Sequence, residues 1–183
     1  MKQLPVILLL ILAVGTSTSI YAQEFPDPPA GFSWQEAPDV NGAFLVPEGW
    51  SFRTEKDKGT IAYFITAQAF APPAKYETGV NINAFLDSPN ASNQVESIIR
   101  AYAERYSTEL THGSFGPFLT LQCEVELEAT KDHDVIRLFY MAISNSRTGS
   151  AYLVMFESSE ARWNEMWPKG EKIVTMLALD GDT

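Results

Sequence analysis

Three glutamates at alternate positions form the most regular charge pattern in the chain. Glu124, Glu126 and Glu128 lie in the segment 118–129. On a β-strand they would share one face, about 6.5–7 Å apart. This spacing suits general acid and base chemistry, but catalytic carboxylates usually converge from different elements, where their environments separate their pKa values. We interpret them first as a solvated face, second as a surface for a cation or basic partner, and third as catalytic groups.

Asn81 and Asn83 alternate in the same way within the segment 79–86, where strand propensity would favour threonine. Two amides on one strand face could bind the backbone of a partner or a sugar. Solvent-facing positions without a function are the simpler interpretation. We keep both asparagines, with the three glutamates, as a candidate partner surface.

Metal ligands are scarce in this sequence. The two histidines are His112 and His133, and the second lies between Asp132 and Asp134. Neighbouring residues on an extended segment point in different directions and aspartate is common in turns, so we predict a polar turn there and leave a weak metal site open. No metal or other cofactor is predicted.

Nucleophiles are also poorly supported. The segment 112–116 (HGSFG) lacks the G-x-S-x-G pattern and its strand–turn–helix setting, so we predict a glycine-rich bend. The single cysteine, Cys123, excludes an intramolecular disulfide and continues the apolar side of an alternating strand. A buried, unreactive thiol is therefore expected. These residues predict a protein that is not an enzyme.

The charge composition excludes some classes of binding partner. Lysine and arginine total 13 against 23 acidic residues, a formal charge of -10. This balance argues against nucleic acid and anionic membranes, both of which need a basic surface. With 183 residues and 45% hydrophobic content, the chain can bury a substantial core.

The N-terminus has the pattern of an export signal. Lys2 precedes an apolar run at 4–14, a polar stretch at 15–19, and the small residue Ala22. The run is shorter than the ~20 residues of a membrane-spanning helix. We predict a signal peptide over 1–22, cleavage after Ala22, and a periplasmic or secreted protein without stable membrane insertion, with a retained N-terminal anchor as the alternative. Residues 23–31 read as a proline-rich extended leader, and 32–183 as one domain.

Hydrophobic periodicity predicts the elements of that domain. Two short strands should form a hairpin with a two-residue Asn41-Gly42 turn. A helix is expected over 90–107, with Asn93 and Glu96 as its capping box. A second helix should follow Ser158 or Ser159, with a kink or break caused by Pro168 near 164–167. The strands are expected at 32–36, 42–46, 60–70, 79–86, 118–129, 135–143 and 151–156.

Three stretches carry a family resemblance: FLVPEGW at 44–50, ETGVNIN at 77–83, and FESSEARWNEMWPKGEKIVTMLALD at 156–180, which includes Trp163 and the KGEKI of 169–173. Together they resemble the PsbP-like family. The resemblance covers roughly 44–179. It implies an α+β fold in which an antiparallel sheet is sandwiched between helices. It also implies accessory or assembly roles, since members of the wider fold assist photosystem II or bind a small GTPase, but it carries over no ligand residues.

We favour an exported, non-enzymatic module that binds a protein partner or assists assembly in the cell envelope. The alternative is a small-ligand or carbohydrate-binding protein with a groove between sheet and helix. An enzyme is the least favoured hypothesis. A deep pocket with convergent polar groups would favour the alternative, and a buried titratable pair in such a pocket would favour the enzyme.

Overall fold

The computed structural model describes residues 25–179 apart from residue 58 and the segments 70–75, 87–89 and 131–133. The predicted signal peptide therefore lies outside the described residues. Residues 25–31, which belong to the predicted leader, form neither helix nor strand. The elements in chain order are β1 (Phe32–Ala37), β2 (Gly42–Pro47), β3 (Ser51–Asp57), β4 (Thr60–Thr66), β5 (Gly79–Phe85), α1 (Ala91–Tyr106), β6 (Thr111–Phe115), β7 (Phe118–Leu127), β8 (Ile136–Asn145), β9 (Ala151–Ser159) and α2 (Glu160–Thr175).

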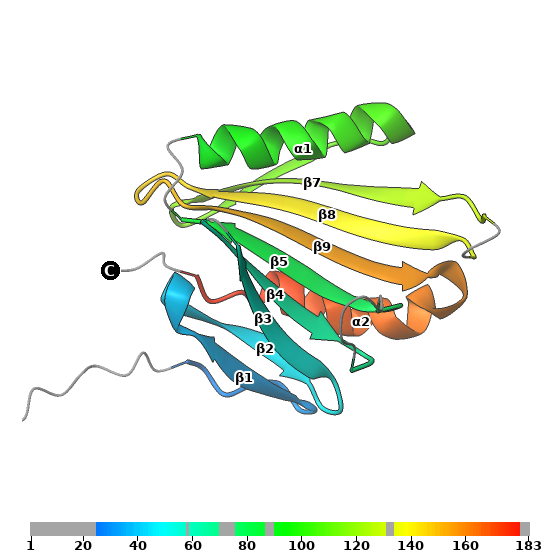
Figure 1. The fold of residues 1–183 in the computed structure, drawn as a ribbon, viewed down its shortest axis with the longest axis horizontal. Helices are drawn as coiled ribbons and strands as arrows, with labels where there is room; N and C mark the ends of the chain where they lie inside the picture. The colour runs from blue at the N-terminus through cyan, green and yellow to red at the C-terminus, as the bar shows by residue number, and fades with distance from the viewer. Residues whose placement is uncertain (1–24, 58, 70–75, 87–89, 131–133, 180–183) are drawn as a thin grey trace, which may run out of the picture.

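Seven of the strands form one antiparallel sheet in the order β3-β4-β5-β9-β8-β7-β6, and β1 pairs with β2 in a separate hairpin. Strands β8 and β9 lie near the middle of the sheet, and their sequences are apolar on both faces. Helix α1 covers one face over β7, β8 and β9, while α2 and the β1–β2 hairpin cover the other (Figure 1). The expected α+β class, with an antiparallel sheet between helices, is confirmed.

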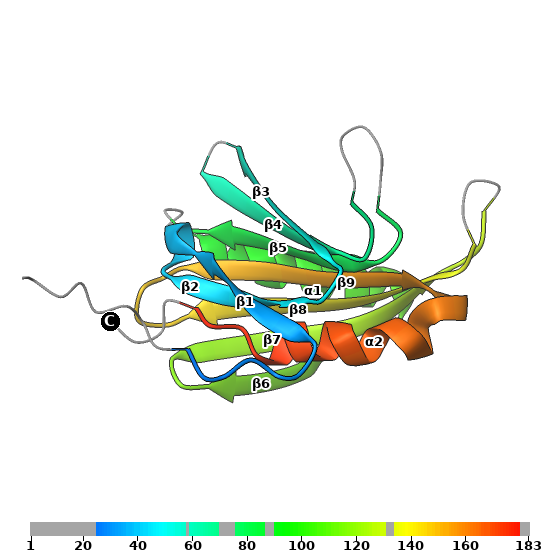
Figure 2. The same cartoon turned by 90° about the horizontal axis from the view of Figure 1, so that it is seen from below.

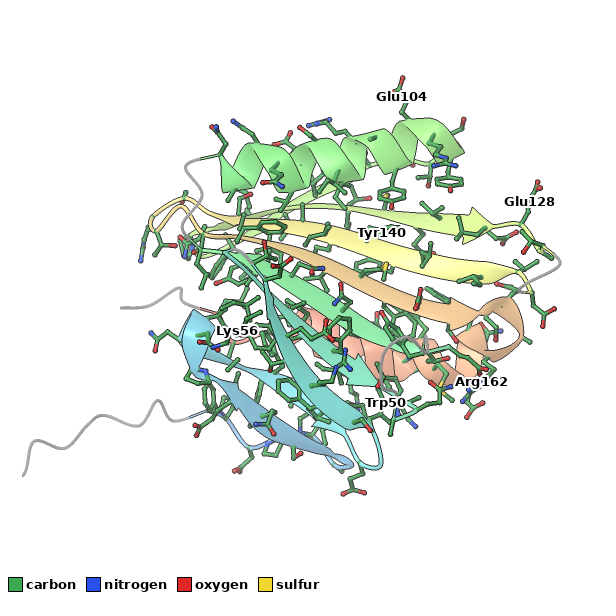
Figure 3. The ribbon with its side chains drawn as sticks, viewed as in Figure 1. Trp50, Lys56, Glu104, Glu128, Tyr140 and Arg162 are labelled. Carbon is green, nitrogen blue, oxygen red and sulfur yellow. The ribbon has the colours of Figure 1, made fainter. Side chains whose placement is uncertain are left out.

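Each helix buries an apolar stripe against its face of the sheet. Val95, Ile99 and Ala103 of α1 recur at helical spacing and are buried. On the sheet below, Tyr140 of β8 stacks on Tyr102 of α1, with ring centres 4.5 Å apart. Figure 3 shows Tyr140 between the sheet and α1, and Glu104 on the outer side of the helix. Among the described residues, no helix is long and apolar enough to cross a membrane.

Strand β7 has the alternation that the sequence predicts. Leu121, Cys123 and Val125 are buried on the side of α1, while Glu124 and Glu126 are exposed on the other. A register shift of one residue would reverse these faces, so the burial of Cys123 also fixes the orientation of the glutamates.

The β1–β2 hairpin is present, but its predicted two-residue turn is wrong. Pro38–Val40 form a 3-10 turn, and Asn41 follows in a left-handed conformation at φ 46°. Gly42 belongs to β2 and pairs with Ala37. A Cβ atom at Gly42 would collide with the carbonyl of Ala178. The glycine is therefore required where the C-terminal segment packs against β2.

The predicted capping box of α1 is also wrong. The helix begins at Ala91, so its N-cap is Asn90 and Asn93 already lies in the first turn. Glu96 instead forms an ion pair with Arg100 one turn later, at 2.7 Å. This pairing uses the i,i+4 neighbour that helix geometry places beside it.

Helix α2 is not broken at Pro168. It runs continuously from Glu160 to Thr175, following Ser159 as its N-cap. Pro168 is exposed, so the carbonyl that loses its helical donor can face water. Trp163 and Trp167 stack at 5.2 Å on the sheet side just before the proline, and packing there holds the helix in place.

Candidate functional site

The three glutamates do not form a uniformly acidic face. Arg137 of β8 lies next to them, with its Nη2 3.2 Å from Glu124 Oε2 and its Nε 3.5 Å from Glu160 Oε2. Its guanidinium also lies over the ring of Trp163 at 4.5 Å. Glu126 is the register partner of Arg137. Arg137 therefore offsets one unit of the negative charge that these glutamates place on this part of the sheet.

Glu128 lies just past the end of β7, which finishes at Leu127. Figure 3 shows it projecting from the end of that strand. The alternation that would align it with Glu124 and Glu126 therefore stops before it. The predicted trio is two residues on the strand face and a third at its end.

Asn81 and Asn83 lie on the opposite face of the sheet from Glu124. Residues that pair across neighbouring strands share a face of the sheet. Asn81 pairs with Met155, Met155 with Tyr140, and Tyr140 with Cys123, so Asn81 lies on the α1 face with Cys123. Strands β9 and β8 also separate β5 from β7. The structure thus does not bring the two predicted groups into one surface.

The two asparagines bond mainly to the protein itself. Asn81 is 9% exposed, and its Nδ2 donates to the carbonyl of Tyr63 at 3.4 Å. Its Oδ1 accepts a hydrogen bond of 2.5 Å from Asn83 Nδ2. Asn83 stays half-buried and lines a shallow hollow of about 340 Å³ with Glu55 and Asp57. Only Asn83 of this pair is accessible to a partner.

The described residues do not bring the candidate metal ligands together. Asp132 and His133 lie outside the described residues, and Asp134 is exposed. His112 pairs with Leu121 of β7. Asp134 precedes β8, whose first residue pairs with Leu127 at the other end of β7. Six residues of strand, about 20 Å, separate Leu121 from Leu127. Within the described ranges, no three His, Cys, Asp or Glu side chains are grouped to hold an ion.

The expected burial of Cys123 is confirmed. Its side chain is 4% exposed and packs in the cluster beneath α1. Burial raises the pKa of the Cys123 thiol, because desolvation disfavours the thiolate. The group therefore lacks both the exposure and the ionisation that a nucleophile needs.

Cys123 should react with a bulky thiol reagent far more slowly in the folded protein than in the unfolded chain, by at least roughly a hundredfold near neutral pH. Reaction must await an opening that exposes the β7 face beneath α1. The rate can be followed by absorbance with and without denaturant. Equal rates would show that β7 presents Cys123 to solvent and that its assigned register is wrong.

The segment 111–119 differs most from the sequence-based expectation. The segment 112–116 is not a bend, because 111–115 forms the edge strand β6 and Gly116, at φ 52°, begins a two-residue turn with Pro117. All of β6 is exposed. We use "β6–β7 end" for residues 111–119, which lie at the edge of the sheet in Figure 2.

Two large hydrophobic side chains are exposed at the β6–β7 end. Phe115 is 47% exposed and Leu119 is 60% exposed, and within the described part of the chain these are the exposed large hydrophobic residues. Phe115 pairs with Phe118 and Leu119 with Ser114, so the two side chains lie on opposite faces of the same hairpin. Large apolar side chains exposed on both faces of an open sheet edge are one sign of an interaction site.

A groove of about 550 Å³ opens beside this hairpin, between α1 and the sheet. Leu121 and Ala142 contribute apolar surface, and Leu119 borders it at the hairpin. Its polar lining includes Ser92, Glu96, His112, Ser114 and Ser144. The groove lies between a helix and the sheet, which is the geometry required for the alternative function.

Sequence reasoning missed the β6–β7 end as a site, although a signal was present. Gly116-Pro117 is a turn dipeptide flanked by Phe115 and Phe118, which favours a tight hairpin. The glycine at 113 obscured the strand before it, because glycine weakens strand propensity. In the structure this glycine leaves room for Thr120, whose Oγ1 would lie 2.7 Å from a Cβ atom at 113.

Comparison with known proteins supports the fold. No protein-family model and no curated protein matches the chain. The solution structure of cyanobacterial PsbP (CyanoP) from Synechocystis sp. PCC 6803 is similar, with a TM-score of 0.53 and 10% identity over 87% of this chain and 98% of that one. A crystal structure from Bacteroides thetaiotaomicron VPI-5482 has a TM-score of 0.46 and 11% identity over 77% of this chain and 46% of that one. The chain has the PsbP-like fold that its sequence resembles.

Proposed function

We propose that this protein is an exported, non-enzymatic binding module that acts through protein–protein contacts at the β6–β7 end. The observation that carries this proposal is the exposure of Phe115 and Leu119 on a hairpin at the sheet edge. Neither side chain is needed to complete the buried core of the sheet. The apolar run at 4–14 supports export.

The chemistry of the groove supports a non-enzymatic role. Its titratable side chains are Glu96 and His112. Glu96 already accepts hydrogen bonds from Arg100 at 2.7 and 2.8 Å, and His112 is exposed on the edge strand. Neither side chain is buried, so the groove lacks the desolvated environment that usually tunes a catalytic acid or base.

Replacing both Phe115 and Leu119 with serine should remove partner binding and leave folding intact. Exposed apolar side chains contribute to an interface through the water they exclude on docking, and contribute little to the isolated fold. The measurement is affinity capture from the native exported fraction, with identification by mass spectrometry. Wild type should retain a specific protein that the double variant loses.

The matched control is a triple variant with Glu124, Glu126 and Glu128 changed to glutamine. Under our proposal it captures the same partner as wild type, at most with slower association if the partner is basic. Loss of the partner with the triple variant, and retention with the serine variant, would move the site to the glutamates and contradict our assignment.

The groove beside α1 favours a second candidate, the binding of a small ligand or carbohydrate. Its volume of about 550 Å³ and its hydroxyl-rich lining suit such a molecule. A ligand that binds there should raise the unfolding midpoint of wild type in a concentration-dependent way. It should have no such effect on Ser144→Trp, whose indole would fill the groove.

A further inference from the structure

The two edges of the sheet differ in charge. Edge strand β3 carries Arg53, Glu55, Lys56 and Asp57, whereas edge strand β6 has the sequence Thr-His-Gly-Ser-Phe without acid or lysine. Charged side chains on an edge strand oppose pairing with another chain, and natural sheets use them for that purpose. Only the β3 edge is protected in this way.

The register shows which backbone groups of β6 are available. Phe115 and Phe118 flank the two-residue turn, so this pair exchanges hydrogen bonds, as do its alternate neighbours along the ladder. Ser114 and His112 occupy the positions between them. Their N–H and C=O groups therefore point away from β7, toward the open edge.

The space on both faces beside this edge fits side chains of an added strand. On the α1 side, residues opposite His112 and Ser114 would point toward the groove with its Leu119, Leu121 and Ala142 surface. On the other side, a side chain near Phe115 would contact an exposed aromatic ring. An extended chain along β6 therefore lies beside Phe115 on one face and, across Ser114, faces the groove that Leu119 borders on the other.

The strand added at β6 could come from a second copy of this chain or from a different protein, and the net charge favours the different protein. A second copy would bring together two chains of formal charge -10, which repel each other. A different chain with basic residues gains from the same charge, and Glu109, two residues before β6, lies near one end of such a strand. We propose that β6 binds an extended segment of a partner protein as an added strand, with apolar residues at alternate positions and basic residues at its ends. This inference rests on the proposed function.

A peptide selection tests whether β6 binds an added strand. Random nine-residue peptides displayed on phage are selected against the purified native protein, and the enriched peptides are synthesised with blocked ends. We expect alternating apolar residues with flanking lysine or arginine. Binding should slow hydrogen exchange at the His112 and Ser114 amides, because those groups acquire partners.

A matched pair of variants separates backbone pairing from side-chain contact. Ser114→Pro removes an outward N–H without breaking the ladder to β7, and should weaken peptide binding roughly tenfold or more through the lost hydrogen bond and the bulk of the ring. Ser114→Ala retains the N–H and should bind as wild type does. Thermal unfolding checks that both variants fold, and the exchange experiment on wild type needs neither of them.

Each other outcome overturns strand addition at β6. No enriched peptide, peptides without alternation, or peptides that bind Ser114→Pro normally would contradict it. A dimer in sedimentation that Ser114→Pro dissociates would make the occupant a second copy. Loss of the partner with the Phe115 and Leu119 serine variant, together with failure of these tests, would leave the proposed function intact and remove only the strand-addition mode.

Discussion

Replacement of Phe156 with alanine is expected to lower the free energy of unfolding by about 3–5 kcal/mol, the usual cost of removing a buried phenylalanine. Phe156 of β9 is 0% exposed, and its ring centre lies 5.3 Å from that of Trp163 and 5.4 Å from that of Trp167. These rings join the sheet to α2, so the cavity would open between two elements that cannot easily close it. Since a typical domain has about 5–15 kcal/mol of stability, this loss would be a large fraction of the total.

Phe115→Ala is the matched control, because it removes the same ring from an exposed position. Its cost should be about 1 kcal/mol, because the ring is 47% exposed and loses mainly its 4.9 Å contact with Phe118. Urea unfolding of both variants, with equal m-values checked, measures the two costs. Similar losses for the two positions would show that Phe115 is part of the folded core, and would remove the main support for the β6–β7 end as a binding site.

The sequence predicted the elements whose local pattern matches their burial. The alternation through Leu121, Cys123 and Val125 gave β7 and its faces correctly, because one face of that strand is dry and the other is wet. The stripe of Val95, Ile99 and Ala103 gave α1 for the same reason. In both elements the apolar side chains recur with the period of the secondary structure, and these same side chains are the ones buried in the fold.

The periodicity of side chains did not predict the two edge strands of the sheet, β3 and β6. Strand β3 was missed because its last four residues, Glu-Lys-Asp and the preceding threonine, are all exposed, and β6 because glycine interrupts it. Both strands are edges and pair on one side, and Phe52 at the start of β3 also packs against the core. Which strands lie at the edges depends on long-range order, such as the placement of β9 between β5 and β8, and a local pattern does not contain it.

The predicted glutamate surface shows the same limit. The residues and their shared face were identified, but the cation beside them was not. Arg137 lies between apolar residues in its own strand, and only the β7–β8 register places it opposite Glu126 and within 3.2 Å of Glu124. The charge of a sheet surface is thus a property of strand pairing, and a single strand cannot predict it.

Gly170→Ala is expected to lower the free energy of unfolding by about 1–3 kcal/mol, the usual cost of forcing extra volume into a packed core. In an exposed helix interior the same change would raise stability by about 1 kcal/mol. The sign reverses here because a Cβ atom at Gly170 would lie 2.5 Å from Cδ2 and 2.6 Å from Cε2 of Phe156. The absence of a side chain lets α2 approach β9 closely, and this contact lies two residues after Pro168 in the helix.

A double-mutant cycle with Phe156→Leu tests that cause. Leucine lacks the ring atoms that Gly170 faces, so in this background Gly170→Ala should cost little or become stabilising, with a coupling energy of about 1 kcal/mol or more. Urea unfolding of the four proteins gives the coupling. Gly170→Ala that stabilises the wild-type background would show that α2 does not rest on Phe156 at this point. The stacked tryptophans alone would then have to hold the helix continuous across its proline.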